Sequence, residues 1–147
     1  LQWIFGFPKS LYAVGGSISR LGLNVEDVVG VLMEMVINSC TVPVTLHMDF
    51  LQQPTRRSCL VYGEKGSIYA DLSSRELILV YPDGSKQEYS WVKSDRNQQF
   101  VDQTCHFFDC VRGVARPKVG VNEGKKSLLM ALAVKQSFAT RTSVDMQ

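Results

Sequence analysis

Helical periodicity is confined to the last third of this chain. Apolar residues recur at spacings of three and four over residues 97–111 and again over 122–139, as on one face of an α-helix. Before them, period-two alternation and short apolar runs between turn residues indicate β-strands. Strands followed by helices predict an α+β fold, in which a large, mainly antiparallel open β-sheet carries the two C-terminal helices on one face.

The expected strands are separated by short turns. They are residues 10–19, 27–37, 42–53, 57–62, 67–72, 76–81 and 86–91. Short connections favour antiparallel neighbours, because a parallel pair needs a crossover of about a dozen residues or more. Either Gly63 or Gly66 can supply the positive φ of a tight hairpin turn. Asn122 is expected to cap the second helix.

The strand expected at 27–37 is apolar on both faces. Met33 and Met35 lie on one face, and Leu32 and Val36 on the other. Two helices cover only one face of the sheet, so the second face is expected to meet another protein surface, since so large an apolar patch is unusual on a soluble monomer. A homodimer through this open sheet face is the preferred hypothesis, because two-fold dimers are the commonest assemblies.

Size and composition are those of an ordinary globular domain. The chain has 147 residues, 45% of them apolar and 20% charged, which is enough for one domain with its own core. A net charge of +2 is too small to indicate nucleic acid or a membrane as partner. Four irregularly spaced cysteines are expected to be reduced, mostly buried thiols of a cytoplasmic protein.

Polar residues on one strand and before the first helix are candidates for substrate binding. His47 and Asp49 share one face of the strand at 42–53. They are candidates for binding substrate hydroxyls or for a pH-sensitive interface contact, and a partly solvated rim is the alternative. Arg96 and Asn97 lie in a strand-to-helix loop, where substrate-contacting residues often collect, although capping and solvation also explain them.

Two adjacent arginines follow Pro54. Successive strand side chains point to opposite faces, so one of Arg56 and Arg57 can reach a carboxylate or phosphate of a substrate. A guanidinium binds such a group through two parallel hydrogen bonds. The alternative is a solvated edge or an ion pair with Glu64 or Asp49.

Other reactive side chains do not form a recognisable site. His106 and Cys110 are four residues apart on one helical face, but two ligands are too few for a metal site. Ser127 and Ser137 have no His and Asp near them in the sequence, so a nucleophilic triad is not supported. No catalytic, cofactor-binding or metal-ligating residue is therefore predicted.

Five local sequences occur in the order found in one oxidoreductase family. They are W-x-x-G-x-P at 3–8, the V-E-D that opens a long strand at 25–27, G-x-x-G-x-I at 63–68, an aromatic helix ending in glycine at 107–113, and a G-x-x-S-L helix with its sequel at 124–144. Over nearly its whole length the chain resembles the C-terminal domain of the glucose–fructose oxidoreductase, inositol dehydrogenase and rhizopine catabolism (Gfo/Idh/MocA) family.

The resemblance implies a role in carbohydrate metabolism. Members of the family are NAD(P)-dependent oxidoreductases that act mostly on sugars, inositols and nucleotide sugars. Residues 1–147 would then be a single C-terminal domain for substrate binding and oligomerisation, with a sugar-like small molecule as ligand in the intact enzyme. Within the family, residues 42–53, Arg56 with Arg57, and 94–97 are most similar to members from sialic-acid-like sugar pathways.

The cofactor and acid–base motifs of that family are not in this sequence. It contains no G-x-G-x-x-G to bring backbone N–H groups to a pyrophosphate, no E-K-P, and no counterpart of the active-site His, which would precede Leu1. Residues 1–8 resemble the end of a helix, stopped by Gly6 and closed by Pro8, with no initiating Met. The chain is therefore expected to be an inactive fragment of an NAD(P)-binding parent. The alternative is a non-enzymatic β-sheet dimerisation or interaction module.

Overall fold

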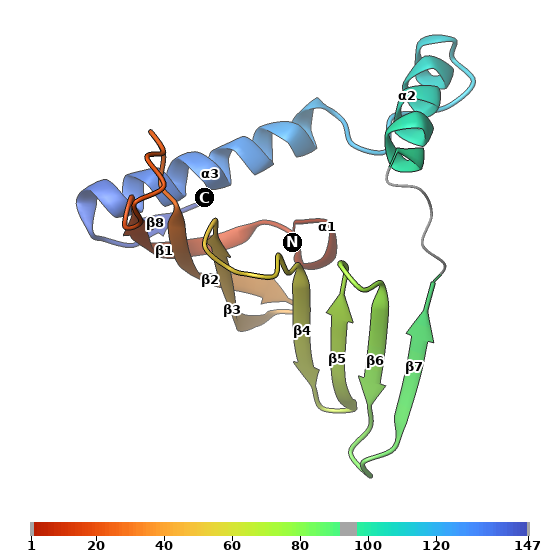
Figure 1. Ribbon diagram of the computed structural model, residues 1–147, viewed down its shortest axis with the longest axis horizontal. Helices are drawn as coiled ribbons and strands as arrows, with labels where there is room; N and C mark the ends of the chain where they lie inside the picture. The colour runs from red at the N-terminus through yellow and green to blue at the C-terminus, as the bar shows by residue number, and fades with distance from the viewer. Residues whose placement is uncertain (1, 92–96, 147) are drawn as a thin grey trace. The chain divides into compact units, whose positions relative to one another are not determined.

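The computed structural model describes residues 2–91 and 97–146 and has an α+β fold, which confirms the predicted class (Figure 1). Contacts along the chain divide it into two compact units, residues 1–51 with 118–147 and residues 52–117. The elements in chain order are α1 (Gln2–Phe5), β1 (Pro8–Gly16), β2 (Val28–Ile37), β3 (Cys40–Asp49), β4 (Ser58–Gly63), β5 (Gly66–Asp71), β6 (Glu76–Val80), β7 (Lys86–Ser90), α2 (Gln98–Val111), α3 (Val121–Thr140) and β8 (Val144–Asp145).

The first unit is built on an antiparallel sheet with the strand order β3-β2-β1-β8. Strand β2 is central, and the register places Val31 between Ala13 of β1 and Leu46 of β3. Because side chains alternate along each strand, the same register sends one set of side chains from all three strands to a common face. Apolar members of this set form the core of the unit: Leu11, Ala13, Val31, Met33 and Met35 are buried.

Helix α3 covers that face of the sheet. Ala133 is buried in the core, and Val134 and Phe138 pack against it. The apolar stripe expected at 122–139 therefore contacts β1 and β8 (Figure 1).

Local contacts set the ends of the two helices in this unit. Helix α1 ends where the sequence indicated, because Gly6 takes a φ of +82° and donates its N–H to the carbonyl of Gln2. Helix α3 begins one residue earlier than expected. The carboxylate of Glu123 accepts the N–H of Gly120 (N–Oε2 3.0 Å), so Gly120 is the N-cap and the predicted cap at Asn122 is wrong.

The two-residue strand β8 was not expected from the sequence. Within the described part of the chain, it pairs with Ser10 and Leu11 of β1 alone. Further along β1, the N–H of Ala13 donates to Oγ of Ser137 (2.9 Å), and this hydroxyl donates to the carbonyl of Thr142 (2.7 Å). The completely buried Ser137 therefore continues the hydrogen bonding of β1 where β8 ends, and ties α3 to the sheet.

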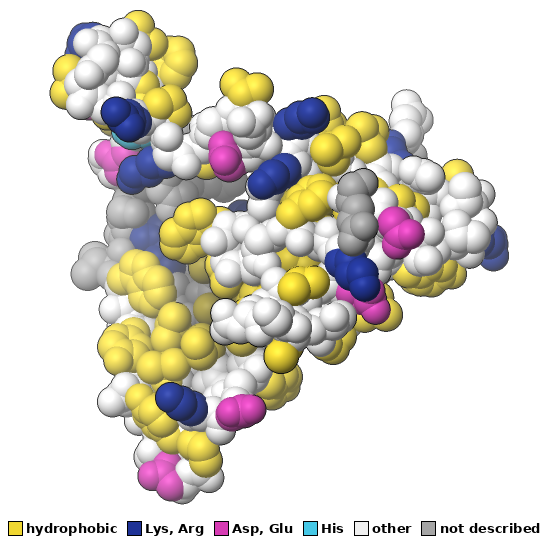
Figure 2. All heavy atoms as spheres, turned by 180° about the vertical axis from the view of Figure 1, so that it is seen from behind, with side chains coloured by type: hydrophobic (Ala, Val, Ile, Leu, Met, Phe, Trp, Pro, Cys, Tyr) yellow, Lys and Arg dark blue, Asp and Glu magenta, His cyan; other side chains and the backbone are white. Residues whose placement is uncertain are grey.

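The second unit contains an antiparallel sheet of β4, β5, β6 and β7 in chain order. At its first hairpin, Gly66 takes a φ of +136°, and a Cβ there would lie 2.3 Å from the carbonyl oxygen of Val80. Gly66 and not Gly63 therefore supplies the positive φ. Among the described residues of 52–117, no apolar side chain is buried. Figure 2 shows hydrophobic side chains gathered on the surface of the molecule.

The strands form two sheets, whereas a single large sheet was expected. Strand β3 ends at Asp49, whose carboxylate accepts the N–H of Leu51 (2.7 Å) and turns the chain. Pro54 follows, and a proline has no N–H with which to continue a ladder. Residues 50–57 consequently form no strand, and the strand expected at 42–53 ends four residues early. Of the two C-terminal helices, α3 packs on the first sheet, whereas no residue of α2 is buried.

Candidate functional site

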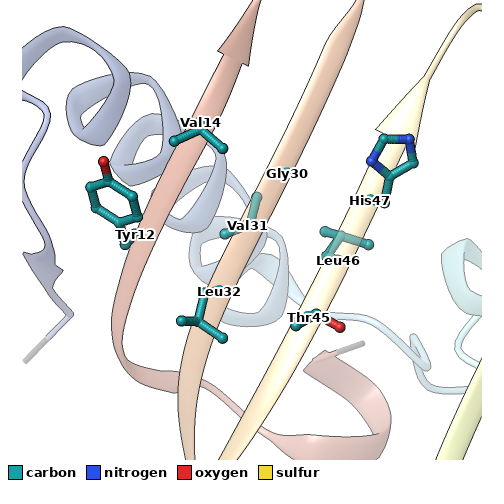
Figure 3. Close-up of a pocket in the computed structure, with 8 residues that line it drawn as sticks. All are labelled: Tyr12, Val14, Gly30, Val31, Leu32, Thr45, Leu46 and His47. Atoms are coloured by element: carbon teal, nitrogen blue, oxygen red, sulfur yellow. The ribbon is translucent and has the colours of Figure 1, made fainter.

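The face of the first sheet opposite α3 is exposed in the first unit (Figure 3). The register assigns to it alternate residues of β1, β2 and β3. This surface, termed the bare face, consists of Ser10, Tyr12, Val14, Gly30, Leu32, Glu34, Val36, Thr41, Pro43, Thr45 and His47. Val14, Leu32 and Val36 are each more than half exposed, so the apolar second face expected at 27–37 is present.

A shallow hollow of about 320 Å³ lies on the bare face. Gly30 forms its floor because it has no side chain, and its strand neighbours Val14 and His47 stand on either side (Figure 3). A Cβ at Gly30 would lie 3.7 Å from Cγ2 of Val14, which is ordinary van der Waals contact. The polar groups among the lining residues are the hydroxyls of Tyr12 and Thr45 and the imidazole of His47.

His47 and Asp49 form a polar pair at the edge of this hollow. Nε2 of His47 lies 2.8 Å from Oδ2 of Asp49, as expected for residues two apart on one strand face. The His47 side chain is 64% exposed, whereas that of Asp49 is 10% exposed. The other oxygen of Asp49 holds the N–H of Leu51. The carboxylate is thus fixed on both sides, and the imidazole can still meet a ligand or a partner.

The guanidinium of Arg56 already has partners within the second unit. Its Nη2 donates to the hydroxyl of Tyr69, its Nε lies 3.4 Å from Oδ2 of Asp71, and the group stands 5.7 Å from the centroid of the Tyr69 ring. The hydrogen bond to Tyr69, assisted by Asp71, raises the pKa of Arg56. Arg56 therefore forms an ion pair, as the alternative interpretation expected, but its partner is Asp71 and not Glu64 or Asp49.

Arg57 differs from its neighbour because its backbone is hydrogen-bonded, whereas its side chain has no hydrogen bond to a described residue. The N–H of Arg57 donates to Oγ of Ser73 (3.0 Å), and its carbonyl accepts the N–H of Leu72 (2.8 Å). Nearby, the N–H groups of Ser74 and Ser73 bind the carboxylate of Asp71 and lower its pKa. The Arg57 guanidinium hydrogen-bonds to none of the described residues.

The remaining predicted contacts lie at the start of α2. Arg96 is outside the described residues. Asn97 is the N-cap of α2, where its carbonyl accepts the N–H groups of Phe100 and Val101 (both 3.0 Å), but its side chain makes no capping hydrogen bond. Asn97 therefore occupies the N-cap position, but the alternative that its side chain caps the helix is wrong. Of the described candidates, His47 and Asp49 belong to the first unit, and Arg56, Arg57 and Asn97 to the second.

Asp27 is a buried carboxylate whose importance the sequence did not reveal. It is 2% exposed and accepts the N–H of Ile18 (2.7 Å) and both the N–H (2.8 Å) and the hydroxyl of Ser19. These donors, the N–H of Ile18 first and the hydroxyl of Ser19 next, lower the pKa of Asp27. The signals available in the sequence were its place at the end of V-E-D at 25–27 and directly after a Ser- and Gly-containing loop.

Metal-ligating side chains do not gather within residues 2–91 and 97–146: no three of His, Cys, Asp and Glu lie together there. In the same residues, no helix combines the length and apolar character needed to span a bilayer. All four cysteines are free, yet Cys40 and Cys105 are exposed and Cys59 and Cys110 are half-buried. The expectation of mostly buried thiols is therefore wrong, in part because two of them lie on α2, where nothing is buried.

Sequence comparisons identify no relative of this chain. No protein-family model matches it, and no curated protein is similar to it in sequence.

Solved structures, by contrast, match it over almost its whole length. A proposed oxidoreductase from Thermotoga maritima is 20% identical, with a TM-score of 0.76 over 99% of this chain and 43% of its own. The aldose-aldose oxidoreductase from Caulobacter crescentus, complexed with glycerol, is 21% identical, with a TM-score of 0.74 over 99% and 43%. The WlbA dehydrogenase from Bordetella pertussis, in complex with NADH and UDP-GlcNAcA, is 17% identical, with a TM-score of 0.72 over 99% and 42%.

The chain spans less than half the length of these proteins. At such low identities the likeness concerns the fold, and it agrees with the resemblance carried by the five local sequences. The chain therefore has the fold of one portion of these oxidoreductases.

Proposed function

We propose that this chain is the substrate-binding and dimerisation part of an NAD(P)-dependent oxidoreductase that acts on a sugar or nucleotide sugar. The observation that supports this most is the structural similarity of almost the entire chain to oxidoreductases more than twice its length. Two of those structures carry glycerol or a sugar nucleotide. In this proposal NAD(P) is held by a nucleotide-binding domain whose glycine-rich turn is not among these 147 residues.

The bare face is the proposed dimer surface. Leu32, Val36 and Val14 are more than half exposed, and burying an apolar side chain of this size fully is worth about 1.5–3 kcal/mol. A two-fold axis through the face uses each of them twice. His47 and Asp49 supply a polar pair at the margin, which fixes the register of the two copies more than it adds affinity.

Of the two adjacent arginines, Arg57 is the stronger candidate for contacting the substrate. Its side chain has no hydrogen-bond partner among the described residues, and its backbone is fixed by Ser73 and Leu72. A cation presented from a fixed backbone suits a carboxylate or phosphate of the substrate. Arg56, His47, Arg96 and Asn97 are further candidates on the chemistry of their side chains.

The enzymatic part of the proposal is tested by the coding sequence upstream of Leu1. We expect it to encode a strand, a G-x-G-x-x-G turn and a helix, followed by E-K-P. The 147-residue chain alone should not bind NADH in a calorimetric titration, because it contains no glycine-rich turn. An unrelated domain upstream would favour the non-enzymatic interaction module, and binding of NADH by the chain alone would contradict the proposal.

The dimer is tested by sedimentation of the wild-type chain and of Leu32→Glu. A buried, unpaired polar group costs about 1–3 kcal/mol, and a dimer would contain two, so we expect an approximately hundredfold weaker association. Val121→Glu is the matched control, since Val121 is 89% exposed in the first turn of α3, away from the bare face. A strictly monomeric wild-type chain, or equal behaviour of the two variants, would exclude the bare face as the interface.

A further inference from the structure

Helix α2 carries a thiol next to an imidazole. Sγ of Cys110 lies 3.6 Å from Nε2 of His106, within hydrogen-bond range for sulfur. The two residues are four apart and are therefore neighbours on one helical face. Both are half-buried, and no residue of α2 is fully buried. The proposed function uses neither side chain.

We propose that Cys110 is a redox-modification site that reacts with small-molecule disulfides and that His106 accepts its proton. The Cys110 thiolate attacks one sulfur of the disulfide, so that a new S–S bond forms while the original S–S bond breaks. Cys110 is oxidised to a mixed disulfide, and the departing half of the reagent is reduced to a thiolate. The proton from Cys110 passes to Nε2 of His106 and then to the departing thiolate.

The position of Cys110 makes a local proton acceptor necessary. It lies in the last turn of α2, where the partial negative charge of the helix end opposes a thiolate. The adjacent carboxylate of Asp109 forms an ion pair with Arg112 at 3.9 Å, so the guanidinium partly balances its negative charge. Reactive cysteines are typically part-exposed with a cationic or imidazole neighbour, and His106 supplies that neighbour.

Cys105 provides an internal comparison on the same helix. It is exposed and hydrogen-bonds to none of the described residues. If exposure alone controlled reactivity, Cys105 would react faster than the half-buried Cys110. The proposal predicts the opposite order, because the imidazole nitrogen of His106, 3.6 Å from Sγ of Cys110, can accept the proton of this thiol.

The experiment measures the rate of mixed-disulfide formation at each thiol of the 147-residue chain at neutral pH. The probe is 5,5′-dithiobis(2-nitrobenzoate), with oxidised glutathione as a second disulfide. Cleavage by chymotrypsin after Phe107 or Phe108 separates the two helical thiols for mass spectrometry. Cys110 should react several times faster than Cys105, and Cys110→Ser should remove the fast phase.

His106→Gln decides whether the imidazole is responsible. We expect it to slow Cys110 at least about tenfold, as loss of a general base does, and to leave the rate at Cys105 and the helical circular dichroism unchanged. The pH profile of Cys110 should then match that of Cys105. A wild-type Cys105 that reacts as fast as Cys110, or an unchanged Cys110 rate in His106→Gln, would overturn the proposal.

Discussion

Different interactions stabilise the interior of each of the two units of this chain. In the first, α3 covers one face of the sheet and closes a core in which Leu11 and Met35 are at most 2% exposed. In the second, no described apolar side chain is buried, and the one described residue that is buried is the carboxylate Asp71. The first unit therefore depends on apolar burial, and the second on strand ladders and turns.

This difference follows from what each sheet has on its faces. An open sheet without a covering layer gains little from apolar burial and is stabilised mainly by its hydrogen-bond ladders. In the second unit the polar contacts of Asp71 with Ser73 and Ser74 lie in the turn between β5 and β6, and its contact with Arg56 lies beside the start of β4. Substitutions of apolar residues should therefore act very differently in the two units.

The largest effect should come from the core of the first unit. Met35→Ala removes a completely buried side chain and should lower the free energy of unfolding by about 2–5 kcal/mol. Leu79→Ala, on a half-buried strand of the second unit, is the matched substitution and should cost about 1 kcal/mol, since less surface leaves contact. Urea unfolding followed by circular dichroism measures both. Equal losses would mean that the two units share one kind of core.

The next largest loss of stability should come from removing the hydroxyl of Ser137. Ser137→Ala leaves the N–H of Ala13 and the carbonyl of Thr142 without partners, so we expect a loss of about 1–3 kcal/mol. Ser127→Ala is the control on the same helix, because among the described residues its hydroxyl hydrogen-bonds to the side chain of Gln2 alone, and its cost should be under about 0.5 kcal/mol. If both variants unfold at the same urea concentration, Ser137 does not tie α3 to β1.

A pH series compares the buried carboxylates of the two units. The folded pKa of Asp27 and that of Asp71 are both lowered by backbone and hydroxyl donors. Their contribution to stability is therefore present above the unfolded value near about 3.9 and is lost as the pH falls through the folded pKa. Asp27→Asn should be less stable than wild type at neutral pH, and this difference should narrow below about pH 4.

The same series on Asp71→Asn tests the second unit. It should also lose stability at neutral pH and less so in acid, because its carboxylate accepts the N–H groups of Ser73 and Ser74. Asp109→Asn, whose carboxylate contacts Arg112 at 3.9 Å, is the control and should match the wild type at neutral pH. A stability difference that grows as the pH falls would contradict the lowered pKa of these two carboxylates.

Periodicity revealed the elements but not the long-range contacts. The strand at 27–37 and the helix at 122–139 were predictable because their apolar patterns are long and local. Two-residue β8 has no period, and the role of Ser137 depends on its meeting Ala13, 124 residues away. The single-sheet expectation failed at residues 50–57, where short connections alone did not reveal that pairing stops.

The contacts of the candidate site also differ in whether the sequence could predict them. The contact of His47 with Asp49 was predictable because alternation places residues two apart on one strand face. The pairing of Arg56 with Asp71 was not, since it requires the register of β4 against β5 and the turn after it. Sequence thus identified which side chains carry charge, whereas tertiary contacts decide which of them are already satisfied.

The smallest difference in stability should be that between alanine variants of the two adjacent arginines. Arg56→Ala removes hydrogen bonds to Tyr69 and Asp71 and a cation–π contact, so the second unit should lose a small, measurable part of its stability, less than Ser137→Ala costs. Arg57→Ala removes no described contact of its guanidinium and should leave the unfolding curve unchanged. Because its backbone remains tied to Ser73, any loss seen in Arg57→Ala should appear in binding of an anionic ligand and not in folding. An unfolding curve that shifts in Arg57→Ala as much as in Arg56→Ala would show that both arginines are structural, and would remove Arg57 from the proposed substrate site.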